Sequence, residues 1–193
     1  MKLTITTVFF VFLFAGVASA QHFNLGVKGG LNVYTTESET FFKNDPKLGL
    51  HLGLIGHIHL TNPFALQPEL VFSMQGARYN AGGNDVNLSL NYINIPLIFQ
   101  YMFDNGFRLQ AGPHVGILAS AKTKINNTTV NVKDNYETID FGIGVGMSYV
   151  NPATDFGYDI RYNHGLTNIN KTGTSSNYNR GFQVGVFYLI NHN

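Results

Sequence analysis

The chain of 193 residues contains no cysteine, which excludes disulfide bonds, thiol catalysis and the acylated-cysteine anchor of a lipoprotein. Charged residues make up only 12% of it, about half the usual share for a water-soluble domain. The formal net charge is +1, so the basic surface that nucleic-acid binding requires is absent. After residue 20 there is no run of 18 apolar residues, and therefore no transmembrane helix is expected there. Only β-strands could then cross a membrane.

The first twenty residues have the pattern of a cleaved secretory signal peptide. Lys2 precedes an apolar and hydroxyl stretch over residues 3–17, and Ala18-Ser19-Ala20 forms a small-residue cleavage signature. At roughly 15 residues the stretch is too short to span a bilayer comfortably as a helix. We therefore expect residues 1–20 to be removed and residues 21–193 to form one mature domain with eleven basic and eleven acidic residues.

The mature region alternates apolar and polar residues with the period of two that is typical of β-strands. In the first strand Phe23, Leu25 and Val27 are separated by Asn24 and Gly26. The pattern predicts eight strands, over residues 23–33, 48–60, 64–75, 88–102, 107–120, 140–149, 155–162 and 181–190. Two irregularities are expected. Pro68 predicts a bulge or gap in the third strand, and imperfect alternation over residues 88–92 predicts a register change at a bulge in the fourth.

Long polar connections alternate with tight turns along the chain. The long connections cover residues 35–46, 80–87, 122–135 and 164–178. Outward aromatic residues lie beside the tight turns: Phe64, Tyr101, Phe107, Tyr149, Phe156 and Tyr188. Short periplasmic turns, long external loops and aromatic girdles are typical of outer-membrane barrels. The sequence therefore predicts an all-β fold, an eight-stranded antiparallel up-and-down transmembrane β-barrel, which lies in the lipid of a bacterial outer membrane. Side chains fill a barrel of this size, so we do not predict a porin.

Seven charged residues fall on the predicted inward face: Lys28, Glu69, Arg108, Asp140, Asp155, Asp159 and Arg161. Buried charges must be paired or they cost several kcal/mol each, so we predict a structural network of ion pairs in the lumen. The first pairing expected is Glu69 with Arg108 or Arg161. A catalytic acid–base pair would use the same residue types, but structural networks perturb carboxylates too, and we predict no catalytic residues.

Four histidines also face inward: His51, His57, His59 and His114. Neutral imidazoles are common metal ligands, so these residues are metal-site candidates. No carboxylate motif accompanies them, and histidines bonded to other lumen groups would give the same pattern. We predict no metal and no cofactor. Gly142, Gly144 and Gly146 share one face of a predicted strand, where small residues relieve crowding in a narrow lumen.

Several segments resemble a known family. They are residues 26–32 (GVKGGLN), 66–73 (LQPELVFS), 92–97 (YINIPL), 161–162 (RY) and 165–169 (GLTNI). The mature chain resembles the small outer-membrane β-barrel domain proteins of Bacteroidetes, which are often grouped with the PorT-like proteins. The resemblance implies a barrel and implies no particular activity, cofactor or substrate.

Three functional hypotheses follow. The first is a non-enzymatic barrel whose external loops contact envelope or surface protein partners. The second is a soluble, exported barrel of the lipocalin type, in which the apolar face would line a ligand cavity. The third is an outer-membrane lipid-modifying enzyme, for which the sequence offers only dispersed polar residues.

Overall fold

The computed structural model describes residues 23–38, 45–172 and 176–190, so the expected signal peptide lies outside the described residues. In chain order the elements are β1 (Phe23–Ser38), β2 (Asp45–Thr61), β3 (Phe64–Ala81), β4 (Asn84–Met102), β5 (Phe107–Ile125), β6 (Thr128–Asn131), the short helix η1 (Lys133–Asn135), β7 (Ile139–Val150), β8 (Phe156–Gly165) and β9 (Asn177–Ile190). In this part of the chain, no helix has the length and apolar character needed to cross a bilayer.

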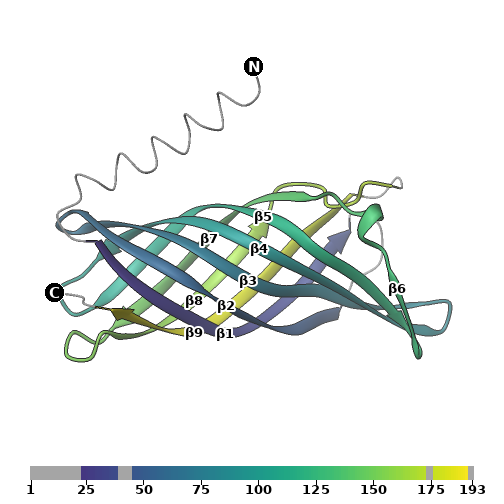
Figure 1. The fold of residues 1–193 in the computed structure, drawn as a ribbon, viewed down its shortest axis with the longest axis horizontal. Coiled ribbons are helices and arrows are strands. Elements are labelled where there is room, and N and C mark those ends of the chain that lie inside the picture. The colour runs from purple at the N-terminus through teal and green to yellow at the C-terminus, as the bar shows by residue number, and fades with distance from the viewer. Residues whose placement is uncertain (1–22, 39–44, 173–175, 191–193) are drawn as a thin grey trace, which may run out of the picture.

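Eight of these strands close into a ring, which Figure 1 shows from the side. The hydrogen-bonded order is β4-β3-β2-β1-β9-β8-β7-β5, and the pairing of β4 with β5 joins the two ends. Each neighbouring pair is antiparallel. The short strand β6 pairs with residues 122–125 of β5 and lengthens the sheet beyond the ring. The predicted eight-stranded up-and-down barrel is confirmed, with β6 as an addition to it.

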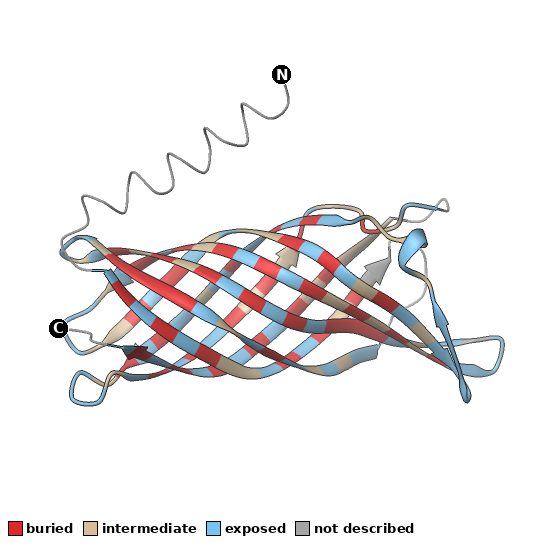
Figure 2. Cartoon of the chain, viewed as in Figure 1, coloured by how far each residue is buried: buried red, intermediate tan, exposed pale blue. Residues whose placement is uncertain are grey.

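The ring carries apolar side chains outside and polar side chains inside, because successive residues of a strand point to opposite faces. Leu25 and Leu52 are 54% and 69% exposed on the outside, whereas Lys28 and His51 are almost fully buried. Figure 2 shows the alternation of buried and exposed residues along the strands. A soluble lipocalin-type barrel requires the opposite polarity, so the second hypothesis of the sequence is not favoured.

The strands differ greatly in length. β8 has 10 residues, close to the 9–11 that a tilted strand needs to cross a bilayer, whereas β3, β4 and β5 have 18, 19 and 19. The tight turns between β2 and β3, β4 and β5, and β7 and β8 lie at one end of the ring, which we call the turn end. The surplus length of β3, β4 and β5 therefore projects from the other end (Figure 1). We call this projection, residues 76–91 and 119–131, the flange.

Two loops that the sequence predicted are strands of the flange in the structure. Residues 80–87 and 122–135 were expected to be polar connections, but most of them continue the strands into two hairpins. The hairpins turn at Gly82 and Gly83, with φ of 59° and 83°, and at Asn126, with φ of 51°. The alternation continues in the flange with its polarity reversed, so an apolar-outside pattern could not detect these strands.

The irregularity expected at Pro68 is confirmed, and the register change expected near residues 88–92 occurs, but its bulge is on β5 and not on the fourth strand. Pro68 pairs with Leu97, and the ladder of β3 with β4 resumes at Val71 without a shift in register, so the irregularity is a gap. The register of β4 with β5 shifts between Asn91 and Tyr92. The extra residue is on β5, since the partners of Asn91 and Tyr92 are two positions apart there.

Aromatic side chains gather at the turn end, as predicted. Five of the six expected residues are between 40% and 42% exposed on the outer surface, namely Phe64, Tyr101, Tyr149, Phe156 and Tyr188. The rings of Phe64 and Tyr101 are 5.5 Å apart, and Phe103 lies 4.9 Å from Tyr101 and 5.7 Å from Phe107. These amphipathic rings suit the interface between hydrocarbon and water.

Candidate functional site in the barrel interior

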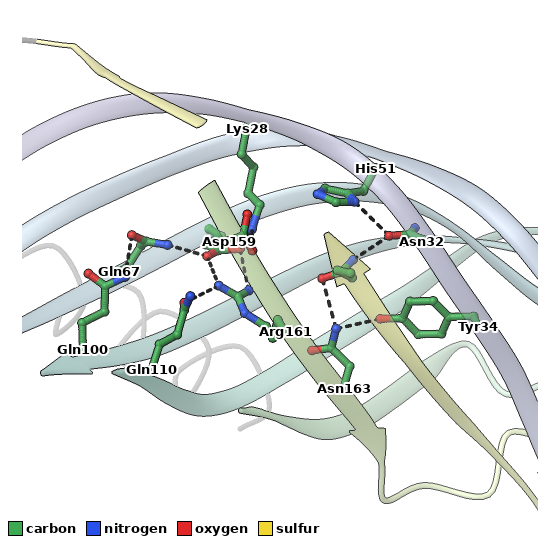
Figure 3. Close-up of polar contacts among 12 residues, drawn as sticks. Lys28, Asn32, Tyr34, His51, Gln67, Gln100, Gln110, Asp159, Arg161 and Asn163 are labelled. Atoms are coloured by element: carbon green, nitrogen blue, oxygen red, sulfur yellow. Dashed lines mark hydrogen bonds and ion pairs between the residues drawn. The ribbon is translucent and has the colours of Figure 1, made fainter. Parts of the chain in front are cut away.

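Four charged residues meet in the middle of the lumen, from strands on different sides of the ring (Figure 3). Arg161 on β8 donates to both carboxylate oxygens of Glu69 on β3, at 2.8 and 3.0 Å. Lys28 on β1 lies 3.4 Å from Glu69 and 3.3 Å from Asp159. Two cations thus balance two carboxylates, all of them at most 5% exposed. Such pairing offsets the cost of taking charges out of water.

Neutral amides extend this network toward the turn end. Gln67 donates to Glu69 at 2.7 Å, and Gln100 donates to Gln67 at 2.9 Å. Gln110 accepts a 2.8 Å hydrogen bond from Arg161. Each residue occupies an inward position of the strand period, so side chains from β3, β4, β5 and β8 join across the lumen. These hydrogen bonds cross the interior and connect four of the eight strands.

Arg108 joins this network at Gln100, its member nearest the turn end. Its Nη1 is 3.4 Å from the side-chain oxygen of Gln100 and 3.5 Å from Nδ1 of His57. The sequence left two partners open for Glu69, and in the structure its arginine partner is Arg161. The choice depends on which strands face each other across the ring, and the alternation along a single strand does not show this.

A second polar layer lies on the side of the ion network nearer the flange, and it was missed by sequence reasoning. Asn32 Oδ1 accepts from Gln183 at 3.1 Å and lies 2.8 Å from Nδ1 of His51. Asn163 donates to Gln183 at 3.0 Å and to the hydroxyl of Tyr34 at 2.8 Å. The signal was present, since these residues hold inward positions of their strands, but only charged residues and histidines were singled out.

The remaining two predicted charges are in different places. Asp140 is 4% exposed and accepts a 2.8 Å hydrogen bond from Asn179. Asp155 is a correction, because it lies in the turn before β8 with φ of 56° and not inside the lumen. Its N–H donates to Asn151 at 2.9 Å and its carbonyl accepts from Leu189 at 3.1 Å. The turn ends one residue later than predicted, so the inward series begins after Asp155.

The four histidines do not come together. His57 and His59 are neighbours, with ring centroids 4.6 Å apart, while His51 is bonded to Asn32 and His114 lies against Gly142. Among the described residues, no three histidine, cysteine, aspartate or glutamate side chains are grouped so that they could hold a metal ion.

Glycines of β7 make room for the central arginine. A Cβ atom on Gly144 would lie 3.1 Å from Cδ of Arg161 and 2.8 Å from the side-chain oxygen of Asn163. A Cβ on Gly146 would lie 2.3 Å from the carbonyl oxygen of Ile160. Real Cβ atoms essentially never come so close to backbone, so the glycines allow β7 and β8 to pack with a bulky arginine beside them.

An apolar cluster lies inside the barrel toward the flange end. Its buried members, which we call the cap cluster, are Leu88, Leu90, Tyr92, Leu118, Ala121 and Ile169. Ile169 comes from the connection between β8 and β9, where its backbone bonds to Glu137 and Asn177 at 2.8 Å each. Tyr136 packs against the cluster, and burial raises the pKa of its hydroxyl to about 12. The interior thus changes from polar in the middle to apolar under the connections.

A closed ring of eight strands, apolar outside and polar inside, defines a transmembrane β-barrel, since closure leaves no strand edge unpaired in hydrocarbon. The family described as "Outer membrane protein beta-barrel domain" matches residues 19–171, and the chain belongs to this family. The protein is therefore an outer-membrane β-barrel protein, located in the bacterial outer membrane. No curated protein sequence matches the chain.

Solved structures share this fold at low sequence identity. Neisserial surface protein A is 16% identical, with a TM-score of 0.56, over 85% of this chain and 96% of that chain. Ail, the attachment invasion locus protein of Yersinia pestis, is 13% identical, with a TM-score of 0.54, over 86% of this chain and 98% of that chain. Ail in complex with the heparin analogue sucrose octasulfate is 11% identical, with a TM-score of 0.53, over 88% and 100%. At such identities the likeness shows the fold alone.

Proposed function

We propose that this protein is a sealed, non-enzymatic barrel that acts as a structural and interaction protein through its flange end. The observation that supports this most is the occupied interior. The Lys28–Glu69–Arg161–Asp159 network crosses the middle of the lumen, and the cap cluster lies between this network and the flange end. With its interior used for packing, the barrel offers partners the outer surface of its longer end.

The flange end faces the outside of the cell in this proposal. Outer-membrane barrels have short periplasmic turns and longer external segments, and the tight turns here are opposite the flange. Both ends of the described chain, Phe23 and Ile190, lie at the turn end. Removal of residues 1–20 on export, which leaves residues 21–193 as the barrel domain, belongs to the same proposal, and mass spectrometry of the isolated protein would test it.

Two similar structures are consistent with a role in surface contact. One is named as a surface protein, and the other is named for attachment and was solved with a heparin analogue. A role of this kind, with envelope or surface partners, suits a barrel that has a projecting sheet. The finer assignment to PorT-like proteins of Bacteroidetes stays part of this proposal, on the segments that resemble that family.

The enzyme alternative would need a nucleophile such as a serine, and three serines of the strands, Ser73, Ser120 and Ser148, give it little support. Ser73 and Ser148 are at most 3% exposed inside the lumen, where a nucleophile could not reach membrane lipid. Ser120 bonds to Asn91 at 2.9 Å in the flange. None of these three residues has a histidine among the hydrogen-bond partners that we identify in the described chain. A lipid-modifying activity would need a different nucleophile.

The test is a pull-down of detergent-solubilised protein from an envelope fraction, with a matched pair of variants. In one variant both flange hairpins are shortened by replacing residues 80–85 and 124–129 with two-residue turns. In the control, the turn of residues 151–155 at the opposite end is replaced. We expect partners to be lost with the shortened flange and kept with the altered turn. Partner capture that is unchanged by the shortened flange would contradict the proposal.

A further inference from the structure

Three cations project from the outer surface of the flange. Arg78 lies on β3, and Lys122 and Lys124 lie on β5, all three exposed. The salt bridges found among the described residues are all in the lumen, and none of these three cations takes part in one. Their positive charges therefore face the molecules that surround the flange.

The strand register places these cations in two rows that are separated from the apolar belt by one mixed row. From the belt outward, successive outward-facing rows across β3, β4 and β5 are Phe72–Ile93–Ile117, Met74–Asn91–Ser120, Gly76–Ser89–Lys122 and Arg78–Asn87–Lys124. The outer surface is wholly apolar in the first row and mixed in the second, where Met74 is still apolar, and the cations lie in the third and fourth rows. Such a change marks the zone in which hydrocarbon gives way to headgroups.

The inner surface changes in the opposite sense at the same height. Leu88, Leu90 and Ala121 alternate with the polar outward residues and are at most 3% exposed. This part of the sheet therefore has the polarity of a protein surrounded by water or by headgroups. The cap cluster packs behind this part of the sheet through residues of β4 and β5.

A fourth cation is fixed beside these rows. Lys47 on β2 reaches over to β4, where its Nζ donates to the carbonyl oxygen of Leu88 at 3.2 Å and to the hydroxyl of Ser89. Asp45 pairs in register with Arg78, and the exposed Asp85 lies one row beyond Asn87 on β4, so two carboxylates oppose these cations. Cations outnumber carboxylates on this face, which we call the basic face and define as Lys47, Arg78, Lys122 and Lys124.

We propose that the basic face binds the phosphate groups of lipid headgroups in the leaflet next to the flange. Neighbouring strands are about 4.8 Å apart, and residues two positions apart on a strand are separated by roughly 7 Å, so these cations can reach phosphates of a single headgroup or of two adjacent ones. A basic residue near an anionic membrane surface contributes about 1 kcal/mol of attraction. The proposal does not depend on the function proposed above, because it concerns the side of the flange and not its tips.

A lipid is a better occupant than a soluble anion because of the direction of the face. The cations point sideways from the sheet, two and three rows above exposed apolar side chains such as Phe72 and Ile93. Lysine side chains can extend their ammonium groups along such a boundary while their methylene chains stay on apolar surface. A soluble anion would have to compete there with the headgroups that already surround the barrel.

The experiment uses the full barrel in nanodiscs in which about one fifth of the lipid is phosphatidylglycerol and the rest is phosphatidylcholine. Native mass spectrometry after gentle release measures how much each lipid is enriched on the protein. We expect phosphatidylglycerol to be enriched, and each of the variants Lys122→Gln and Lys124→Gln to lower this enrichment about fivefold, the equivalent of about 1 kcal/mol per residue. The variants Lys122→Arg and Lys124→Arg should keep it.

Lys171→Gln is the matched control, because Lys171 is an exposed lysine on the connection between β8 and β9 that does not belong to the basic face. The heat-dependent shift on a gel confirms that every variant is folded. An equal loss with Lys171→Gln, or no enrichment at all, would overturn the proposal. Lysine-dependent binding of inorganic pyrophosphate without lipid enrichment would also overturn it, and would assign the face to a soluble anion.

Discussion

Arg161 on β8 holds Glu69 on β3 across the lumen through two hydrogen bonds, of 2.8 and 3.0 Å, although the residues are 92 positions apart in the chain. Both side chains are almost fully buried. A planar guanidinium and a carboxylate fit each other in this two-pronged geometry. Since opposite walls of the ring are tied at this point, we expect the pair to matter for the stability of the whole barrel.

The first prediction concerns this pair. Glu69→Gln leaves Arg161 without its carboxylate, and removing one partner of a buried pair costs about 3–5 kcal/mol. Combining Glu69→Gln with Arg161→Met leaves Lys28 and Asp159 in balance, so the double variant should lose less than the two single losses added together. Urea unfolding in lipid vesicles measures this coupling, with the exposed Asp85→Asn as a near-neutral control. Strict additivity would mean that the pair is not coupled.

The second prediction concerns the space beside the arginine. Gly146→Ala places a Cβ 2.3 Å from a backbone oxygen of β8, and such overpacking costs about 1–3 kcal/mol. Gly29→Ala is the matched control, because its Cβ would lie in ordinary contact, 3.5 Å from its nearest neighbours. The same urea assay compares the two. If the two glycines tolerated alanine equally, the close packing of β7 on β8 would be wrong.

The barrel could be predicted because each strand meets hydrocarbon on one side and a polar lumen on the other, which imposes a period of two on residues such as Phe141, Ile143 and Val145. Most of the flange could not, because polar outward residues such as Lys122 and Lys124 were assigned to a connection once apolar residues were expected outside. The inversion only becomes visible when neighbouring strands are placed in register, and a single sequence does not contain that register.

The interior was predictable in kind but not in detail. The alternation places Lys28, Glu69 and Arg161 on inward positions, yet the partner of each depends on how far the strands are staggered around the ring. Asp155 was misplaced because the preceding turn uses one more residue, with φ of 56°, than the alternation suggested. Turn conformation is a local property that the strand period cannot reveal.

The third prediction concerns the cap cluster. Ile169→Ala removes a fully buried side chain at a cost of about 2–5 kcal/mol, and the loss should stay local to the flange end. Hydrogen exchange should become faster at Glu137, whose N–H is bonded to the carbonyl of Ile169, but not in the middle of β8. The exposed Leu166→Ala is the control. Unchanged exchange at Glu137 would show that Ile169 does not hold the cap.

The fourth prediction concerns the orientation of the barrel in the membrane. Because the chain contains no native cysteine, a single introduced cysteine can be labelled specifically. Thr128→Cys on β6 and Ala153→Cys in the opposite turn are both exposed positions. A maleimide on a large polymer that cannot pass the outer membrane should label Thr128→Cys on intact cells, and Ala153→Cys only after the membrane is opened. The reverse labelling would invert the proposed orientation and place the basic face in the inner leaflet.

The central claim is that packed side chains seal the barrel. The most direct measurement is the ionic current through a planar lipid bilayer that contains the purified, folded protein, with a porin in the same bilayer as the positive control. The account predicts no steady conductance above the bare bilayer, because the Glu69–Arg161 network and the cap cluster occupy the lumen. Stable, reproducible conductance steps from the wild-type protein would contradict it.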